Sequence, residues 1–173
     1  MTIQVGDTLP EATLREFIEV EANGCTVGVN AFKVSDLVKG KRVVIFAVPG
    51  AFTPTCSEQH LPGFVAHADA LSAKGIDEIW CLSVNDPYVM GAWGKDQGTA
   101  GKVRMVGDGN GAFTTAAGMM LDRSAAGLGM RSARYSMLVV DGTVRTLNLE
   151  APGKFEVSGA AALLEQARAL RAG

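Results

Sequence analysis

Cys56 is the side chain in this 173-residue chain whose surroundings best fit a reactive group. It follows a loop rich in proline and glycine at 49–55, which separates an apolar, β-rich run from a segment with helical spacing. A cysteine in the first turn of a helix lies near unsatisfied backbone amides and the positive end of the helix dipole. Both favour the thiolate, which is the reactive form. We therefore predict that Cys56 is a nucleophile; the alternative is a buried structural cysteine at a helix start.

The other two cysteines, Cys25 and Cys81, complete an odd number with no CxxC pair. This is unlike the paired cysteines of small secreted domains, so we expect free thiols. We interpret Cys25 as structural. Cys81 lies in an apolar strand pattern where inert buried thiols are common, and its participation in chemistry stays open.

Two histidines and one glycine-rich segment also carry possible chemistry. His60 follows Cys56 by four residues, on the same face of the expected helix, but no third or fourth metal ligand accompanies the pair. We expect no metal, flavin or haem. We expect His60 to line the pocket beside Cys56 or to contact a reducing partner, and His67 to lie at the surface. Residues 107–111 mimic a phosphate loop but lack the following lysine, so we predict a turn there.

The elements around Cys56 are a strand before it and a helix that it begins. Residues 42–48 form an apolar, β-rich run that Pro49 ends, as expected for a buried strand in a covered sheet. Residues 56–73 carry apolar side chains at helical spacing, and Gly75 stops the pattern. The remaining predicted elements are a strand at 78–84, a helix at 87–95 with Asp86 as N-cap, a strand at 102–106 and a helix at 158–170.

Two hairpins complete the pattern. The paired segments are 12–20 with 25–32, and 135–140 with 143–149. Asn23-Gly24 and Asp141-Gly142 are the turns, and an Asp-Gly pair supplies the positive φ values of a two-residue turn. Strands that alternate with helices predict one α/β domain over residues 1–173. Its expected architecture is a thioredoxin-like three-layer fold, a central mixed sheet covered by helices on both faces, with an N-terminal β-hairpin. The rival doubly wound nucleotide fold usually has a glycine-rich loop after the first strand, which is missing here.

The segment around Cys56 resembles the peroxiredoxins. Pro49, Thr53 and Cys56 match their PxxxTxxC signature. The run from Pro49 to Phe64 is similar to the atypical peroxiredoxin-5 or type II branch, and reads Pro-Gly-Ala-Phe-Thr-Pro-Thr-Cys-Ser-Glu-Gln-His-Leu-Pro-Gly-Phe. Segments 75–79, 83–87 and 131–136 resemble the same branch, so the resemblance covers most of the chain.

The resemblance implies a role for four residues. Cys56 would be the peroxidatic cysteine, Thr53 would help to hold thiolate and peroxide, and Pro49 would shield the sulfur from water. The family's active-site arginine matches Arg134, which precedes Tyr135. Each of the last three residues also has a purely structural alternative. Thr53 would then be a helix cap, Pro49 the residue that ends the strand, and Arg134 a surface charge or ion-pair partner.

Reduction of a peroxide would use Cys56 and Arg134 in one reaction. A thiolate attacks one peroxide oxygen while donors stabilise the charge that grows on the leaving oxygen. The guanidinium of Arg134 suits this task because it stays charged and offers a fixed fork of donors. The expected product is a sulfenic acid on Cys56, which another thiol must reduce.

The second thiol can come from this chain or from another molecule. Type II relatives include members with a second cysteine at the place of Cys81, which is therefore a possible resolving cysteine. Relatives of the peroxiredoxin-5 type carry one near the C-terminal helix, but residues 154–160 contain none. A one-cysteine cycle is favoured, with glutathione or glutaredoxin as reductant and thioredoxin as a further candidate. The resemblance also implies a homodimer.

Composition excludes several other classes of protein. Lys and Arg total 16 against 18 for Asp and Glu, with no run of one sign, so we expect no nucleic-acid partner. The apolar runs are too short for a membrane span and no secretion signal opens the chain, so we expect a cytoplasmic protein. The expected substrates are hydrogen peroxide and small alkyl hydroperoxides. A peroxide-sensing switch with little turnover is the alternative, and disulfide exchange is disfavoured because CxxC is missing.

Overall fold

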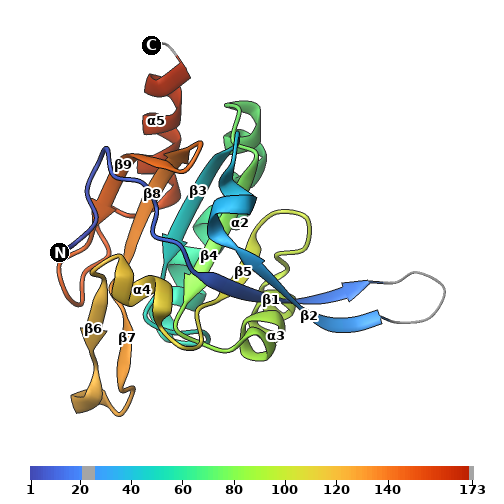
Figure 1. Cartoon of the computed structure of the whole chain (residues 1–173), viewed down its shortest axis with the longest axis vertical. Helices are drawn as coiled ribbons and strands as arrows, with labels where there is room; N and C mark the ends of the chain where they lie inside the picture. The colour runs from blue at the N-terminus through green and yellow to red at the C-terminus, as the bar shows by residue number, and fades with distance from the viewer. Residues whose placement is uncertain (21–25, 172–173) are drawn as a thin grey trace.

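A seven-stranded mixed sheet forms the centre of the molecule in the computed structural model, which describes residues 1–20 and 26–171 (Figure 1). Its strand order is β2-β1-β5-β4-β3-β8-β9. The central strands β3, β4 and β5 are parallel, whereas β1 and β8 run antiparallel to their neighbours β5 and β3. The strands are β1 (Thr13–Val20), β2 (Thr26–Lys33), β3 (Arg42–Ala47), β4 (Glu78–Ser83), β5 (Arg104–Gly107), β8 (Tyr135–Val140) and β9 (Thr143–Leu149).

Helices cover both faces of this sheet, because the side chains of the central strands are apolar on both sides. Along β3, Val43 and Ile45 face one core cluster and Val44 and Phe46 face the other, the alternation that a pleated strand imposes. The first cluster is closed by α1 (Val34–Val38) and α4 (Ala112–Ala116), and the second by α2 (Leu61–Ala73), α3 (Pro87–Gln97) and α5 (Ala160–Arg171). The predicted thioredoxin-like, three-layer α/β fold is confirmed.

The two predicted strand pairs are present. In β8–β9, Asp141 and Gly142 have φ values of 48° and 79°, as the Asp-Gly turn requires. In β1–β2, Thr13 pairs with Lys33 and the pairing continues antiparallel to the end of β1. The predicted turn Asn23-Gly24 and Cys25 lie outside the described residues.

Three features differ from the sequence prediction. The helix expected from residue 56 begins as a π-helical turn, η1 (Cys56–His60), before α2. A two-stranded sheet of β6 (Met120–Asp122) and β7 (Met130–Ser132), with the short 3-10 turn η2 (Ser124–Ala126) between them, was not expected. Neither were α1 and α4, whose five residues are too few to show a helical period.

Other predicted elements shift by two residues or fewer. The N-cap of α3 is confirmed, since the Asp86 carboxylate accepts the backbone N–H of Val89 at 2.9 Å. Residues 107–111 contain the predicted turn, and the Asp108 carboxylate there accepts the backbone N–H of Thr114 at 2.8 Å, at the start of α4. No helix among the described residues is long and apolar enough to cross a membrane.

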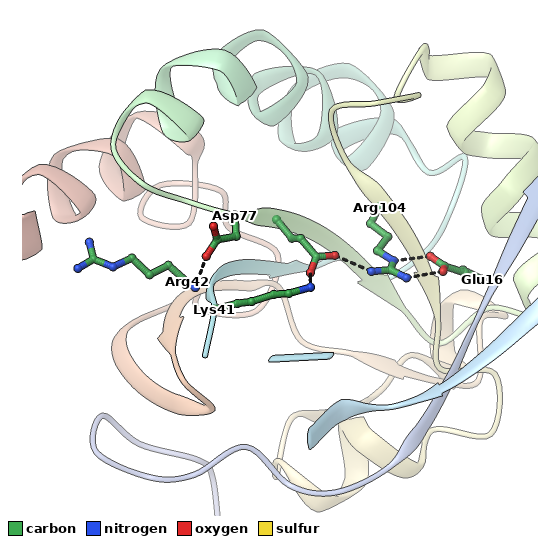
Figure 2. A network of polar contacts seen from close by, with 6 residues as sticks. Glu16, Lys41, Arg42, Asp77 and Arg104 are labelled. Atoms are coloured by element: carbon green, nitrogen blue, oxygen red, sulfur yellow. Dashed lines mark hydrogen bonds and ion pairs between the residues drawn. The ribbon is translucent and has the colours of Figure 1, made fainter. Parts of the chain in front are cut away.

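A network of ion pairs joins β1 of the N-terminal hairpin to the central strands β4 and β5 of the sheet (Figure 2). Arg104 on β5 donates two hydrogen bonds to Glu16 on β1, both at 2.6 Å, and one to Glu78 on β4 at 2.5 Å. Glu78 also accepts Lys41 Nζ at 2.9 Å. The guanidinium therefore links three strands at the end of the sheet where β3, β4 and β5 begin.

Candidate active site

Two strand ends bring the predicted site residues together. Strand β3 ends at Ala47, whose antiparallel partner Tyr135 begins β8. The loop that leaves β3 therefore lies beside Arg134, the residue before β8. As a result, Arg134 Nη2 donates to Cys56 Sγ at 3.2 Å across 78 positions of sequence.

Cys56 begins the π turn and is fully buried. Its carbonyl accepts the backbone N–H of Leu61, a step of five residues, which is the wide turn of a π helix. The backbone N–H of Ser57 donates to the Thr53 carbonyl at 2.9 Å. The indole N–H of Trp93 donates to the Ser57 hydroxyl at 3.0 Å, so α3 also braces this turn. The side chain of Cys56 packs in the core cluster of α2, α3 and α5.

The loop before Cys56 is held in a fixed shape. Phe52 has a φ of 63°, in the left-handed region that non-glycine residues rarely adopt. Thr53 Oγ1 donates to the Gly50 carbonyl at 2.7 Å, which leaves the lone pairs of its oxygen to accept a hydrogen bond from a ligand. The side-chain oxygen of Asn85 accepts the backbone N–H of Ala51 at 3.0 Å. Such strain in an anchored loop is typical of functional sites.

Arg131 supports the same loop and was not singled out from the sequence. Its guanidinium lies so close to Gly50 that an added Cβ would be 3.1 Å from Nη1. Arg131 Nε donates to the Leu128 carbonyl at 2.8 Å, which fixes the side chain in that position. A side chain at position 50 would therefore press on this arginine and on the Thr53 methyl group, which would have to shift by a few tenths of an ångström.

His60 holds Arg134 from behind. Arg134 Nη1 donates to His60 Nδ1 at 3.0 Å, and His60 Nε2 lies 3.0 Å from the Ser158 carbonyl. Since a guanidinium cannot accept a hydrogen bond, the proton of the neutral imidazole must be on Nε2. Burial, and then the positive charge of Arg134, lower the pKa of His60 to about 3.

This position corrects the prediction that His60 lines the pocket or contacts a partner. Its side chain is fully buried, between Arg134, the Ser158 carbonyl and the rings of Phe46 and Phe155. The i, i+4 spacing from Cys56 indicated proximity to the sulfur, but the turn in which both residues lie directs His60 inward. His67 is half-buried, and its Nδ1 lies 2.8 Å from the Gly63 carbonyl.

A cavity of 340 Å³ opens in front of Arg134. Pro49 and Thr53 form part of its wall, together with residues 150–155 that follow β9. This volume suits a small ligand. A larger hollow of 760 Å³ lies between β1 and α3, lined by Phe17 and Tyr88 among others, and contains none of the predicted site residues.

Cys81 lies on β4, fully buried in the same apolar cluster as Cys56. Both thiols are free. Burial, and then the proximity of Cys56, raise the pKa of the Cys81 thiol well above its usual value. Such a thiol is a poor nucleophile at neutral pH. Among residues 1–20 and 26–171, no group of three or more His, Cys, Asp or Glu residues is placed to hold a metal ion.

Comparison with known proteins identifies the family. The Redoxin family model matches residues 4–164. Peroxiredoxin-2E, chloroplastic, of Arabidopsis thaliana is 49% identical over 166 residues, which cover 95% of this chain and 69% of that protein. The chain belongs to the peroxiredoxin family. As a peroxiredoxin, it is a thiol-dependent peroxidase.

Solved structures agree with the peroxiredoxin fold. Reduced Prx3 from Vibrio vulnificus, in complex with hydrogen peroxide, is 48% identical with a TM-score of 0.87, covering 96% of this chain and 99% of that one. A protein from Burkholderia cenocepacia with the provisional name of a thioredoxin reductase is 63% identical with a TM-score of 0.92, covering 95% and 98%. The similarity to that protein is one of sequence and fold. This peroxiredoxin lacks the CxxC pair that is typical of disulfide exchange.

Proposed function

We propose that this peroxiredoxin reduces hydrogen peroxide and small alkyl hydroperoxides at Cys56, and so serves peroxide detoxification and redox homeostasis. The observation that carries the proposal is the 3.2 Å contact between Arg134 Nη2 and Cys56 Sγ beside a small cavity. The contact places a permanent positive charge beside the Cys56 sulfur. This charge favours the thiolate form, which is the form that attacks a peroxide.

The reaction follows from these positions. The Cys56 thiolate attacks one peroxide oxygen, the O–O bond breaks, and the other oxygen leaves as hydroxide or alkoxide and is protonated to water or alcohol. The Arg134 guanidinium stabilises negative charge on the oxygens during this transfer. Thr53 Oγ1 donates to the Gly50 carbonyl, so its lone pair can accept the peroxide O–H and orient the substrate. The half-buried ring of Pro49 contributes to the cavity wall without adding an N–H group.

The sulfenic acid is then reduced by an external thiol. A first thiol condenses with the Cys56 sulfenic acid and releases water, and a second thiol breaks the mixed disulfide and restores the thiol. Glutathione with glutaredoxin, or thioredoxin, would supply these thiols. The complete burial and raised pKa of Cys81 support an external reductant over a resolving role for Cys81.

We also propose a cytoplasmic homodimer. Phe52 and Tyr88 are large apolar side chains that stay exposed in the single chain, at 54% and 64%. Exposed apolar side chains of this size are enriched in protein interfaces. Equilibrium sedimentation of the wild type beside Phe52→Ser and Tyr88→Ser tests this: the variants should dissociate at concentrations where the wild type is dimeric. A monomeric wild type would remove the dimer from the proposal.

The decisive test exposes the reduced protein to substoichiometric hydrogen peroxide with a sulfenic-acid trap present, followed by peptide mass spectrometry. An adduct confined to Cys56, absent from Cys56→Ser and retained in Cys81→Ser, is expected. A Cys56–Cys81 disulfide would make Cys81 the resolving cysteine instead. An unmodified Cys56 would overturn the proposal.

Turnover separates an enzyme from a peroxide-sensing switch. With glutathione and glutaredoxin, or with thioredoxin and its reductase, the wild type should consume peroxide over many turnovers. A single equivalent consumed with either reductant would indicate a switch rather than a peroxidase.

A further inference from the structure

The carboxylate of Glu150, directly after β9, accepts hydrogen bonds from a loop beside Arg134 and His60. Its side chain accepts the backbone N–H groups of Glu156, Val157 and Ser158 at 2.8–2.9 Å and the Ser158 hydroxyl at 2.7 Å. Burial alone would raise the pKa of Glu150, but the hydrogen bonds from Ser158 and its neighbours hold it below the usual value. The carboxylate therefore stays ionised and fixes the loop of residues 150–158, here named the Glu150 loop.

The fixed loop aims one carbonyl at the site. The Ser158 carbonyl accepts His60 Nε2–H at 3.0 Å, His60 Nδ1 accepts Arg134 Nη1 at 3.0 Å, and Arg134 Nη2 reaches Cys56 at 3.2 Å. The hydrogen bonds thus run without a gap from the Glu150 loop to the sulfur.

The Glu150 loop also touches Arg134 directly. The backbone N–H of Glu150 donates to the Arg134 carbonyl at 3.0 Å, so one residue supports both the main chain and, through His60, the guanidinium. The ring of Phe155 in the same loop lies 5.9 Å from the Arg134 guanidinium carbon and 4.9 Å from the His60 ring. Position and orientation of Arg134 thus depend on the shape of this loop.

We propose that Glu150 is a positioning residue for peroxide reduction, which fixes the His60 tautomer and through it the orientation of Arg134. The inference rests on the proposed function of Cys56 and Arg134. If the Ser158 carbonyl moves away, the proton can shift to Nδ1, and an N–H group would then face the guanidinium. Two donors repel each other, so Arg134 would turn from the sulfur and the leaving oxygen would lose its stabilising charge.

The test compares Glu150→Gln with Glu165→Gln, the same substitution at an exposed position on α5. Stopped-flow measurement gives the rate constant of Cys56 with hydrogen peroxide, and site-resolved mass spectrometry gives its alkylation by iodoacetamide, which needs no oxygen stabilised by Arg134. We expect Glu150→Gln to lower the peroxide rate constant about tenfold to a hundredfold, the usual effect of losing a group that orients a functional ligand. Alkylation should fall by a smaller factor, because it loses only the stabilisation of the thiolate by Arg134 and involves no leaving oxygen. Glu165→Gln should match wild type in both assays.

Nitrogen-15 NMR reports which nitrogen of the His60 ring carries the proton. This tautomer would not change if Glu150 only stabilised the fold. The wild type should show the proton on Nε2, and Glu150→Gln should show a mixture of tautomers. If Glu150→Gln fails to fold, Ser158→Ala, which removes only the hydroxyl donor to Glu150, should show the same changes at smaller size.

Three outcomes would contradict either the proposed function of Cys56 or the role of Glu150. A wild type that does not react with peroxide overturns the proposed function itself. A reactive wild type with an equally reactive Glu150→Gln and an unchanged tautomer overturns only the role of Glu150. A loss of alkylation as large as the loss of the peroxide reaction also overturns it, because no effect specific to the leaving oxygen would remain.

Discussion

At the scale of single residues, the neutral imidazole of His60 makes stability depend on pH. Its pKa of about 3 in the folded protein lies below the ordinary value of 6.5. Between these values the unfolded chain binds a proton that the folded chain does not, so stability falls as pH is lowered. We expect this group to remove up to about 1.4 kcal/mol per pH unit.

The prediction is tested by urea denaturation of the wild type and His60→Asn from pH 7 to pH 4. The dependence on pH should be steeper in the wild type, since the variant has no imidazole to protonate. Equal slopes would show that His60 is not the group responsible. Proton NMR should show no protonation of His60 in the folded protein across this range.

Arg134 should not be replaceable by lysine. Its two terminal nitrogens contact His60 and Cys56 at 3.0 and 3.2 Å, and a single ammonium cannot reproduce that fork. We expect Arg134→Lys to lower the rate constant with hydrogen peroxide about a hundredfold or more, as for loss of one oxyanion donor. A rate within a few-fold of wild type in stopped-flow assays would mean that charge alone is sufficient.

Cys56 was predicted from a local signal, its place between a Pro/Gly-rich loop and a helix, whereas Arg134 was reached only through the resemblance to the peroxiredoxins. The structure brings these two side chains into contact, while their catalytic roles stay predictions. Glu150 could not be found in this way, because its five hydrogen bonds go to a loop whose shape no periodicity encodes. His60 was placed near the sulfur, but its direction depended on the wide turn.

At the scale of elements, the π turn η1 sets the direction of Cys56 relative to α2. A π turn contains one residue more than an α turn, so deletion of the exposed Glu58 should restore regular α winding. One residue corresponds to about 100° of rotation in an α helix. Cys56 would then no longer face Arg134, and we expect peroxidase activity to be lost while circular dichroism stays native.

Glu58→Ala is the matched control, since it removes the side chain but keeps the residue count. It should retain activity close to wild type. An active deletion variant would show that the wide turn does not aim the sulfur.

Long elements were predictable and short ones were not. The central strands show apolar runs bounded by glycine or proline, and the structure confirms them within two residues. By contrast, β6 and β7 have three residues each, and their pairing depends on contacts distant in sequence. The π turn was hidden because the five residues Cys56–His60 carry no apolar pattern that would distinguish them from the start of the α helix that follows.

At the scale of the whole molecule, the network around Arg104 should affect stability without affecting catalysis. It lies where β3, β4 and β5 begin (Figure 2), while Cys56 follows the opposite end of β3 in the sequence. Replacing Glu16 by Ala leaves the half-buried guanidinium with one of its two carboxylate partners. We expect a loss of about 1–3 kcal/mol in unfolding free energy, with peroxide kinetics unchanged.

Urea denaturation and stopped-flow assays on the same Glu16→Ala sample check both halves of this prediction. Asp69→Ala serves as a control at an exposed carboxylate on α2. A slower peroxide reaction in Glu16→Ala alone would show that the two ends of the sheet are coupled.

The charge of the group beside Arg134 changes during the reaction. Among residues 1–20 and 26–171, no salt bridge is found from Arg134 to a carboxylate, so the counter-ion of this guanidinium is the Cys56 sulfur when it is ionised. A sulfenic acid is neutral, and its formation leaves a half-buried cation without a matching charge. Each oxidised molecule should therefore melt at a lower temperature than its reduced form. Protein turnover in the cell would then remove first the molecules that had met peroxide and had not been reduced.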